Sequence, residues 1–339
     1  MSDATQKVLT IRNLKTYFFL DEGTVHAVDG VNLEIPRGKT IGIVGESGCG
    51  KSVTAFSALR LVSTPGRIVE GEITMHGRDG DVVLTDLDEE SEEIRAIRGK
   101  EISMIFQEPM TSLSPVHRVG EQIVEAVELH MDLHGQAAME HAIYMLERVG
   151  IPDAPRRATE FPHELSGGMR QRVMIAMALS CQPSLLIADE PTTALDVTIQ
   201  AQILDLMRDL QGEFGMSIML ITHDLGVVAE TADEVAVMYL GRVVEQGSVQ
   251  RIFEEPKHPY TRALMRSIPG VGGDRKTELQ TIDGSIPDPF TRLKGCPFHP
   301  RCEDAVAGVC DAGARPDQVS IEDGHDVACV LYKEEVTRG

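Results

Sequence analysis

Residues 45–52 hold the side chains whose types and spacing most directly indicate chemistry, because they read Gly-Glu-Ser-Gly-Cys-Gly-Lys-Ser. The stretch satisfies the G-x-x-x-x-G-K-S/T phosphate-loop pattern from its first glycine to its last serine. The glycines let backbone N–H groups curl around phosphate oxygens, and a helix that begins there adds its positive end. Lys51 would then reach the β- and γ-phosphates, and Ser52 would bind Mg²⁺. The expected nucleotide contacts in this stretch are Gly45, Glu46, Ser47, Gly48, Cys49, Gly50, Lys51, Ser52 and Val53.

Cys49 lies inside this loop, where N–H groups at the helix end are expected to lower the pKa of its thiol. Packing is the main role expected of this side chain. Modification of the thiol should nevertheless block nucleotide binding, and bound nucleotide should protect it.

A second group that could act on phosphates follows an apolar run at residues 185–188. Asp189 is expected to coordinate Mg²⁺, and Glu190 to activate an attacking water as general base. Two acids after an apolar strand are common, so the assignment gains its weight from the phosphate loop upstream.

A second site for anions is predicted where Ser166, Gly167 and Gly168 open a helix. One chain has no evident use for a second anion site on the same nucleotide. The arrangement makes sense if two chains pair head to tail, with each Ser-Gly-Gly segment capping the γ-phosphate held by the other chain.

The elements around these residues predict an α/β fold of the P-loop NTPase class. An apolar, β-branched run at 40–44 is expected to be a buried strand before the loop, and a helix is expected at 53–61. Strands and helices then alternate, which implies a mostly parallel sheet with helices on its faces. The predicted elements of this part are 184–188, 198–210, 217–222, 225–231 and 235–240.

Other segments flank this core. Short strands within 8–35 suggest an antiparallel subdomain, and helical spacing follows from 119 to about 150. Residues 86–97 are expected to form an exposed helix, and 101–106 a strand that ends at Gln107. Tyr17, Phe18 and Phe19 fit a core position or an adenine platform equally well.

Net charge and the distribution of apolar residues limit the kinds of partner and location expected for the chain. A formal net charge of −21 argues against nucleic acid as a partner. The polar, acidic N-terminus does not resemble a signal peptide, and no stretch approaches the ~20 apolar residues of a membrane span. The chain itself is therefore expected to be cytosolic, with any membrane role supplied by other subunits.

Beyond the phosphate loop, the chain contains Gln107, residues 165–171, Asp189-Glu190, Ala194-Leu195-Asp196 and His223. With the loop, these are the motifs of a known family in their usual order, and the chain resembles the nucleotide-binding subunit of an ABC transporter from residue 8 to about 255. The resemblance implies that Gln107 senses Mg²⁺ and water, that Asp196 lies at the dimer seam, and that His223 contacts the γ-phosphate. It implies Tyr17 or Phe18 as the adenine platform. The expected catalytic residues are then Glu190, His223 and Gln107. The expected Mg²⁺ ligands are Ser52, Gln107 and Asp189. The ATP contacts added to those of the loop are Tyr17, Gln107, Ser166, Gly167, Gly168, Asp196 and His223.

The C-terminal part contains Cys296, Cys302, Cys310 and Cys329. Four clustered cysteines in a cytosolic protein favour a metal site over disulfides. Their spacing fits neither a common zinc site nor a standard ferredoxin, so chemistry alone leaves zinc and an iron–sulfur cluster equally open and favours either over structural free cysteines. Residues 258–261 and 295–302 resemble the C-terminal region of oligopeptide/dipeptide (and nickel) importer ATPases. That resemblance implies a 4Fe-4S cluster, with Zn²⁺ as the alternative.

The resemblance as a whole implies an ATPase subunit that energises a di- or oligopeptide importer. Related nickel or oligosaccharide importers, a soluble non-transport ABC ATPase, and a redox or iron-sensing tail remain as alternatives. The expected domains are a nucleotide-binding domain at 1–255, with a helical subdomain at about 107–180, and a C-terminal region at 256–339.

The same resemblance implies partners. Residues 51–54 resemble the D-type subunit, which pairs with a distinct F-type ATPase as a heterodimer. The other expected partners are two transmembrane permease subunits and, indirectly, an extracytoplasmic solute-binding protein. The expected location is the cytoplasmic face of the membrane, as a peripheral subunit.

Overall fold

A computed structural model describes residues 7–77, 80–107, 112–193, 196–267, 282–322 and 324–333. These residues divide into two compact units between which the chain passes several times. The first unit comprises residues 1–9, 35–40 and 75–221, and the second comprises 10–34, 41–74 and 222–339. Ala194 and Leu195, which belong to one of the motifs of the resemblance, lie outside the described residues, as do residues 268–281.

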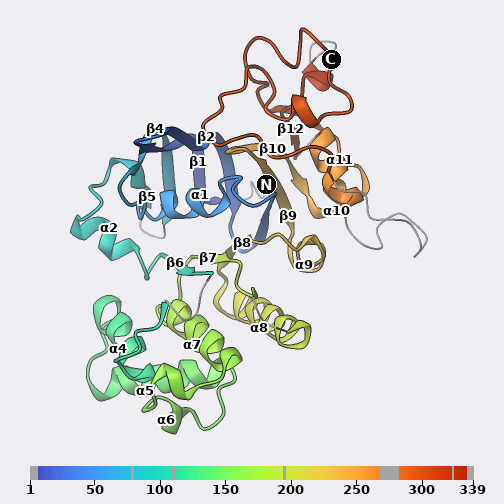
Figure 1. Cartoon of the computed structure of the whole chain (residues 1–339). Coiled ribbons are helices and arrows are strands. Elements are labelled where there is room, and N and C mark those ends of the chain that lie inside the picture. The colour runs from blue at the N-terminus through green and yellow to red at the C-terminus, as the bar shows by residue number, and fades with distance from the viewer. Residues whose placement is uncertain are drawn as a thin grey trace, which may run out of the picture. The chain divides into compact units, whose positions relative to one another are not determined.

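The second unit contains the strand that leads into the phosphate loop. In one sheet the strands follow the order β11-β12-β10-β9-β3, and in another β2, β1 and β4 are neighbours (Figure 1). The β3 strand pairs with β9 in parallel, from Ile41 opposite Glu234 to Val44 opposite Val237. Their bounds are β1 Lys7–Leu20, β2 Gly23–Pro36, β3 Thr40–Val44, β4 Gly66–Gly77, β9 Glu234–Tyr239, β10 Arg242–Ser248, β11 Val319–Glu322 and β12 His325–Val327.

The C-terminal region continues this same sheet. β12 pairs antiparallel with β10, and β11 pairs antiparallel with β12. Tyr239, Tyr260 and Phe298 are fully buried together with the apolar side chains of β9 and β10. Burial of such aromatic rings dominates packing energy, so the C-terminal region shares a core with the strands beside the phosphate loop. The helices here are α1 Lys51–Ala58, α9 Leu225–Thr231, α10 Val249–Glu254, α11 Pro259–Arg266, η3 His299–Arg301 and η4 Val330–Tyr332.

The first unit contains three parallel strands in the order β8-β7-β6, which confirms a parallel sheet in this part of the chain. Every residue of β7 and β8 is buried, as expected for strands covered on both faces. The strands are β5 Gly80–Val83, β6 Ile102–Ile105, β7 Leu185–Asp189 and β8 Ser217–Ile221, and α8 spans Val197–Phe214.

The α-helices between residues 119 and 179 in the first unit pack together as a group (Figure 1). The helical stretch predicted at 119–150 is two helices, because the backbone of Met131 is extended after the first and Gly135 adopts a φ of 57° before the second. The helix predicted at 86–97 is shorter than expected. Ser91 accepts the Ile94 N–H and caps a helix of only six residues. The bounds are η1 Leu84–Asp86, α2 Glu92–Ile97, α4 Val119–His130, α5 Gln136–Arg148, α6 Ala154–Arg157, η2 Pro162–Glu164 and α7 Gly167–Leu179.

Among the residues described, no helix has the length and apolar character needed to cross a membrane.

Candidate nucleotide site

The phosphate loop joins the buried strand β3 to helix α1, as the sequence predicts. Gly50 stands at the helix N-cap with φ of 99°, a left-handed conformation that favours glycine. A Cβ on Gly50 would lie 2.2 Å from the Ala27 carbonyl oxygen, and one on Gly45 2.2 Å from that of Met238. No side chain can therefore be accommodated at either glycine, because the backbone of a neighbouring segment lies too close.

Lys51 closes the loop. Its ammonium donates to the carbonyl oxygens of Gly45 at 2.7 Å and Glu46 at 3.2 Å, and its side chain is buried. A buried ammonium held by carbonyl groups is a positive charge fixed among the backbone N–H groups of a helix start. This cradle fits the phosphates of a nucleotide.

Glu46 points to the C-terminal region. Its N–H donates to the Tyr260 hydroxyl at 2.9 Å, and its carboxylate accepts two hydrogen bonds from Arg301 at 2.7 and 3.0 Å. The sequence gives no sign of these contacts, because the partners lie more than 200 residues away.

Tyr17 is half-buried on β1 in the same unit as the loop. Its ring lies 4.0 Å from the His26 ring, and its hydroxyl donates to Asp29 at 2.7 Å. Burial and the hydrogen bond to Asp29 raise the pKa of Tyr17. Of its neighbours, Phe18 lies against Gly66 and Phe19 lies under the Arg67 guanidinium. The adenine platform at Tyr17 stays a prediction.

Glu190 follows β7 and has a φ of 47°, which is uncommon for a residue with a side chain. Residues with such a strained backbone conformation are found most often at functional sites. The Glu190 carboxylate accepts hydrogen bonds from Gln107 at 3.2 Å and Thr193 at 2.8 Å. The structure thus brings together two residues predicted 83 positions apart, next to buried Asp189. Thr193 was not predicted from the sequence.

Ser166 is the N-cap of α7, which confirms its predicted capping role, and its hydroxyl accepts the Met169 N–H at 3.3 Å. Gly167 has no atom within 4 Å of a Cβ built on it, so this helix start is open. Asp196 caps α8 by accepting the Ile199 N–H at 3.0 Å. His223 is exposed just before α9, in the unit that contains the phosphate loop. Their roles toward ATP stay predictions.

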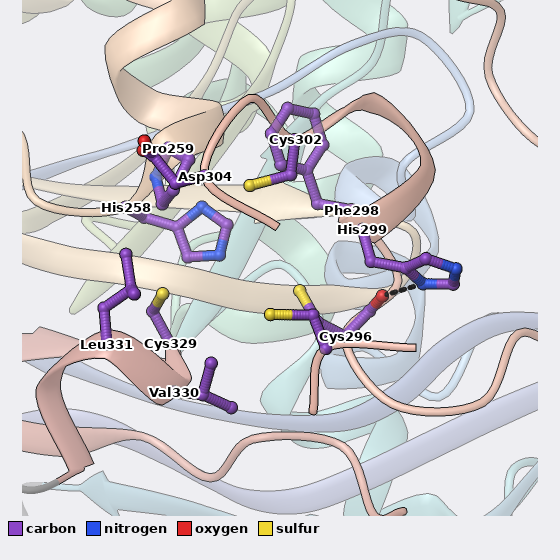
Figure 2. A pocket seen from close by; sticks show the side chains of 11 residues that line it. His258, Pro259, Cys296, Phe298, His299, Cys302, Asp304, Cys329, Val330 and Leu331 are labelled. Atoms are coloured by element: carbon purple, nitrogen blue, oxygen red, sulfur yellow. Dashed lines mark hydrogen bonds between the residues drawn. The ribbon is translucent and has the colours of Figure 1, made fainter. Parts of the chain in front are cut away.

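The four C-terminal cysteines line one small pocket, and Figure 2 labels three of them, Cys296, Cys302 and Cys329. All are free thiols, and burial raises the pKa of Cys296, Cys302 and Cys329, the last to about 11. The cavity between them has a volume of about 10 Å³, enough for one water molecule.

These observations correct the predicted metal centre. Across the described residues, which include all four cysteines, no group of three or more His, Cys, Asp or Glu side chains could hold a metal ion. Metal ligation needs thiolates, and burial raises the pKa of the Cys296, Cys302 and Cys329 thiols. The prediction of a 4Fe-4S cluster on Cys296, Cys302, Cys310 and Cys329 is wrong. The zinc alternative and the metal-binding character of the C-terminal region lack support on the same ground.

Alkylation of Cys49 is expected to be slow and steeply dependent on pH. The thiol is 3% exposed, and burial raises its pKa although the Lys51 ammonium lies 3.7 Å away. This is the opposite of the shift expected from the helix end. Below the pKa, the thiolate fraction and the rate with iodoacetamide should rise about tenfold per pH unit.

ATP should protect Cys49 from this reagent, and Cys181, half-buried after α7, is the matched control that ATP should not protect. Residue-specific labelling is read by mass spectrometry of proteolytic peptides. Protein alkylated at Cys49 that still binds ATP normally would contradict the loop assignment.

Comparisons with known proteins place this geometry among ATP-binding proteins. A family model described as ABC transporter matches residues 28–193, and one described as oligopeptide/dipeptide transporter, C-terminal region, matches 244–310. The chain is 53% identical to a probable peptide ABC transporter ATP-binding protein of Sinorhizobium fredii, over 97% of this chain and 96% of that protein. It is 51% identical to the oligopeptide transport ATP-binding protein AppD of Bacillus subtilis, over 97% of this chain and 98% of that protein.

Solved structures agree. The ATP-binding cassette MJ0796, described as a dimer in a post-hydrolysis state with ADP and phosphate, superposes with a TM-score of 0.62. The two chains are 28% identical, and the superposition covers 71% of this chain and 98% of the MJ0796 chain.

These relatives also correct one predicted partner. The dipeptide transport ATP-binding protein DppD of Bacillus subtilis is 48% identical over 97% of this chain and 96% of that protein, and like AppD it is described only as a transport ATP-binding protein. Their descriptions name no F-type partner. The four-residue match at 51–54 is too short to specify a partner, and the prediction of an F-type heterodimer is wrong.

Proposed function

The chain belongs to the ATP-binding proteins of peptide ABC transporters, and on that premise we propose that it hydrolyses ATP to energise the import of di- or oligopeptides. The observation that carries this proposal is the likeness to peptide-transport ATP-binding proteins along 97% of the chain. The closed phosphate loop, with Lys51 held inside it, supplies the corresponding chemistry.

In this proposal the phosphate loop binds the ATP phosphates, and the side chain of Tyr17 contacts the adenine. Ser52, Gln107 and Asp189 would hold Mg²⁺, which neutralises phosphate charge when bound. These side chains supply hydroxyl, amide and carboxylate oxygens, which are ligands that Mg²⁺ prefers.

Glu190 is proposed as the general base that takes a proton from the attacking water. Its hydrogen bonds from Gln107 and Thr193 fix one carboxylate oxygen, Oε2. His223 is proposed to contact the γ-phosphate. Such positioning of acid–base groups contributes a factor of about 10²–10⁴ to a rate.

A second ATP-binding chain is proposed to complete the site. The open helix start at Ser166, Gly167 and Gly168 would cap the γ-phosphate held by that chain, with Asp196 at the seam. The dimeric state described for MJ0796 supports this arrangement. Two permease subunits and, indirectly, a solute-binding protein are the proposed membrane partners, which places the chain at the cytoplasmic face of the membrane.

The proposed domains are a nucleotide-binding domain at 1–255, with a helical subdomain at about 107–180, and a C-terminal region at 256–339. The matches of the two family models, to 28–193 and to 244–310, support this division.

Uptake of labelled substrates by cells that lack the gene tests the solute. We expect loss of labelled di- or oligopeptide uptake, restored by the wild-type gene and not by a Lys51→Ala variant. Uptake of nickel and of a labelled oligosaccharide is measured in parallel, because these are the alternative solutes. Normal peptide uptake in the deletion strain, together with loss of nickel or oligosaccharide uptake, would show that the chain energises import of that solute and not of peptides.

A further inference from the structure

Two cationic side chains of the C-terminal region reach the nucleotide site from outside the sequence motifs. Arg301 forms a two-point ion pair with Glu46 of the phosphate loop, and its side chain is only 4% exposed. Paired hydrogen bonds between a guanidinium and a carboxylate fix direction as well as distance. The carboxylate would otherwise be an uncompensated negative charge inside a loop that binds phosphates.

Arg301 is held on its own side as well. Its Nε donates to the Asp283 carbonyl at 3.1 Å, and its guanidinium lies 5.9 Å from the Tyr239 ring. The hydrogen bond and ion pair with Glu46 raise the pKa of Arg301, with the Tyr239 hydroxyl contributing. The charge is therefore permanent and its position is fixed.

Tyr260 provides the second contact with the loop, and its own position is set by α11. The Tyr260 N–H donates to Nδ1 of His258 at 3.1 Å. Burial lowers the pKa of His258 to about 4, so that the ring stays neutral and able to accept. The Tyr260 ring lies 4.6 Å from that of Tyr239 and 5.3 Å from that of Phe298. A buried aromatic cluster thus presents one hydroxyl to the Glu46 N–H.

Arg315 reaches the other end of the site. It pairs with Asp29, the carboxylate that also accepts the Tyr17 hydroxyl. Burial acts to raise the pKa of Asp29, but Tyr17 and Arg315 outweigh burial and the pKa falls below its ordinary value. The Asp29 N–H donates to the Gly241 carbonyl, and the Gly241 N–H donates to the Cys49 carbonyl, at 2.8 and 2.9 Å. Asp29 is therefore linked both to Tyr17 and to the loop.

We propose that the C-terminal region positions the nucleotide site, with Arg301 as the positioning residue for the phosphate loop and Arg315 as the positioning residue for Tyr17. This inference rests on the proposed ATP function. Neither arginine touches nucleotide; each acts through a residue that does. The fold of the C-terminal region then sets the affinity for ATP.

The test for Arg301 is the ATP dependence of phosphate release by the purified full-length chain. Arg301→Met is expected to raise the KM for ATP about tenfold, within the usual range for coupling between sites, while kcat at saturating ATP stays within about twofold. Misfolding would instead lower kcat in proportion to the inactive fraction. Arg301→Lys keeps the charge but loses the paired geometry, so an intermediate KM is expected.

Arg266→Met is the matched control. Arg266 belongs to the same region and pairs with Glu303 at 3.2 Å, but both side chains are well exposed. Its KM should equal that of the wild type. Combining Glu46→Gln with Arg301→Met should raise KM no further than Arg301→Met alone, because both changes remove one contact.

Inorganic tripolyphosphate with Mg²⁺ separates the two ends of the site. Arg301→Met should weaken competition by tripolyphosphate as well as binding of ATP, whereas Arg315→Met should weaken ATP binding alone. Wild-type KM in both variants would overturn the inference while leaving the ATPase intact. Absence of ATP turnover in the wild type would instead overturn the proposed function.

Discussion

Replacing Lys51 with alanine is expected to abolish measurable ATP binding. Lys51 is the buried cation of the phosphate loop, and it joins the Gly45 and Glu46 carbonyl oxygens across the loop. Removal takes away both this closure and the charge that faces the phosphates. Charge-assisted hydrogen bonds contribute about 1.5–3 kcal/mol each, so the loss of the two expected from Lys51 to the β- and γ-phosphates should weaken binding about 100-fold or more.

Titration calorimetry with MgATP measures this effect. Lys15→Ala is the matched control, because Lys15 lies in the same unit and pairs with Glu70 at 2.6 Å on the surface of β1 and β4. Wild-type affinity is expected for it. A Lys51→Ala variant that binds ATP as tightly as the control would exclude the loop as the phosphate site.

Replacing Glu190 with glutamine is expected to separate binding from turnover. The amide keeps the size of the carboxylate but cannot accept the proton of the attacking water. We expect ATP to bind with nearly unchanged affinity, while phosphate release falls about 1,000-fold. The paired state of two chains should then persist with ATP bound, as judged by size-exclusion chromatography with labelled nucleotide.

Glu213→Gln controls for the loss of one negative charge in the same unit, since Glu213 pairs with Arg148 at the surface. It should hydrolyse ATP at the wild-type rate. Near-normal turnover in Glu190→Gln would remove Glu190 from the role of general base and leave the ATP site itself untouched.

Local patterns predicted well what local physics determines. The strand before the phosphate loop, the buried strands β7 and β8, and the Ser166 cap depend on runs of apolar residues and on hydrogen bonds between near neighbours. The ion pair between Arg301 and Glu46 could not be predicted, because nothing in either segment indicates a partner 255 residues away. Long-range ion pairs are set by how strands and loops pack.

For the four C-terminal cysteines, the sequence predicted correctly that they cluster but predicted wrongly what they bind. Their spacing placed the four thiols around one pocket correctly. Spacing does not encode the volume between the thiols or how deeply they are buried, and the described residues contain no group of three or more His, Cys, Asp or Glu side chains that could hold a metal ion. The Ser91 cap similarly shortened a predicted helix through one hydrogen bond.

Phosphate release from ATP by the purified chain is the decisive measurement for the proposed ATPase activity. We expect steady release that requires Mg²⁺, saturates with ATP and is lost in the Lys51→Ala and Glu190→Gln variants. ATP that binds to the wild-type chain without any release of phosphate, at protein concentrations that permit pairing, would contradict it.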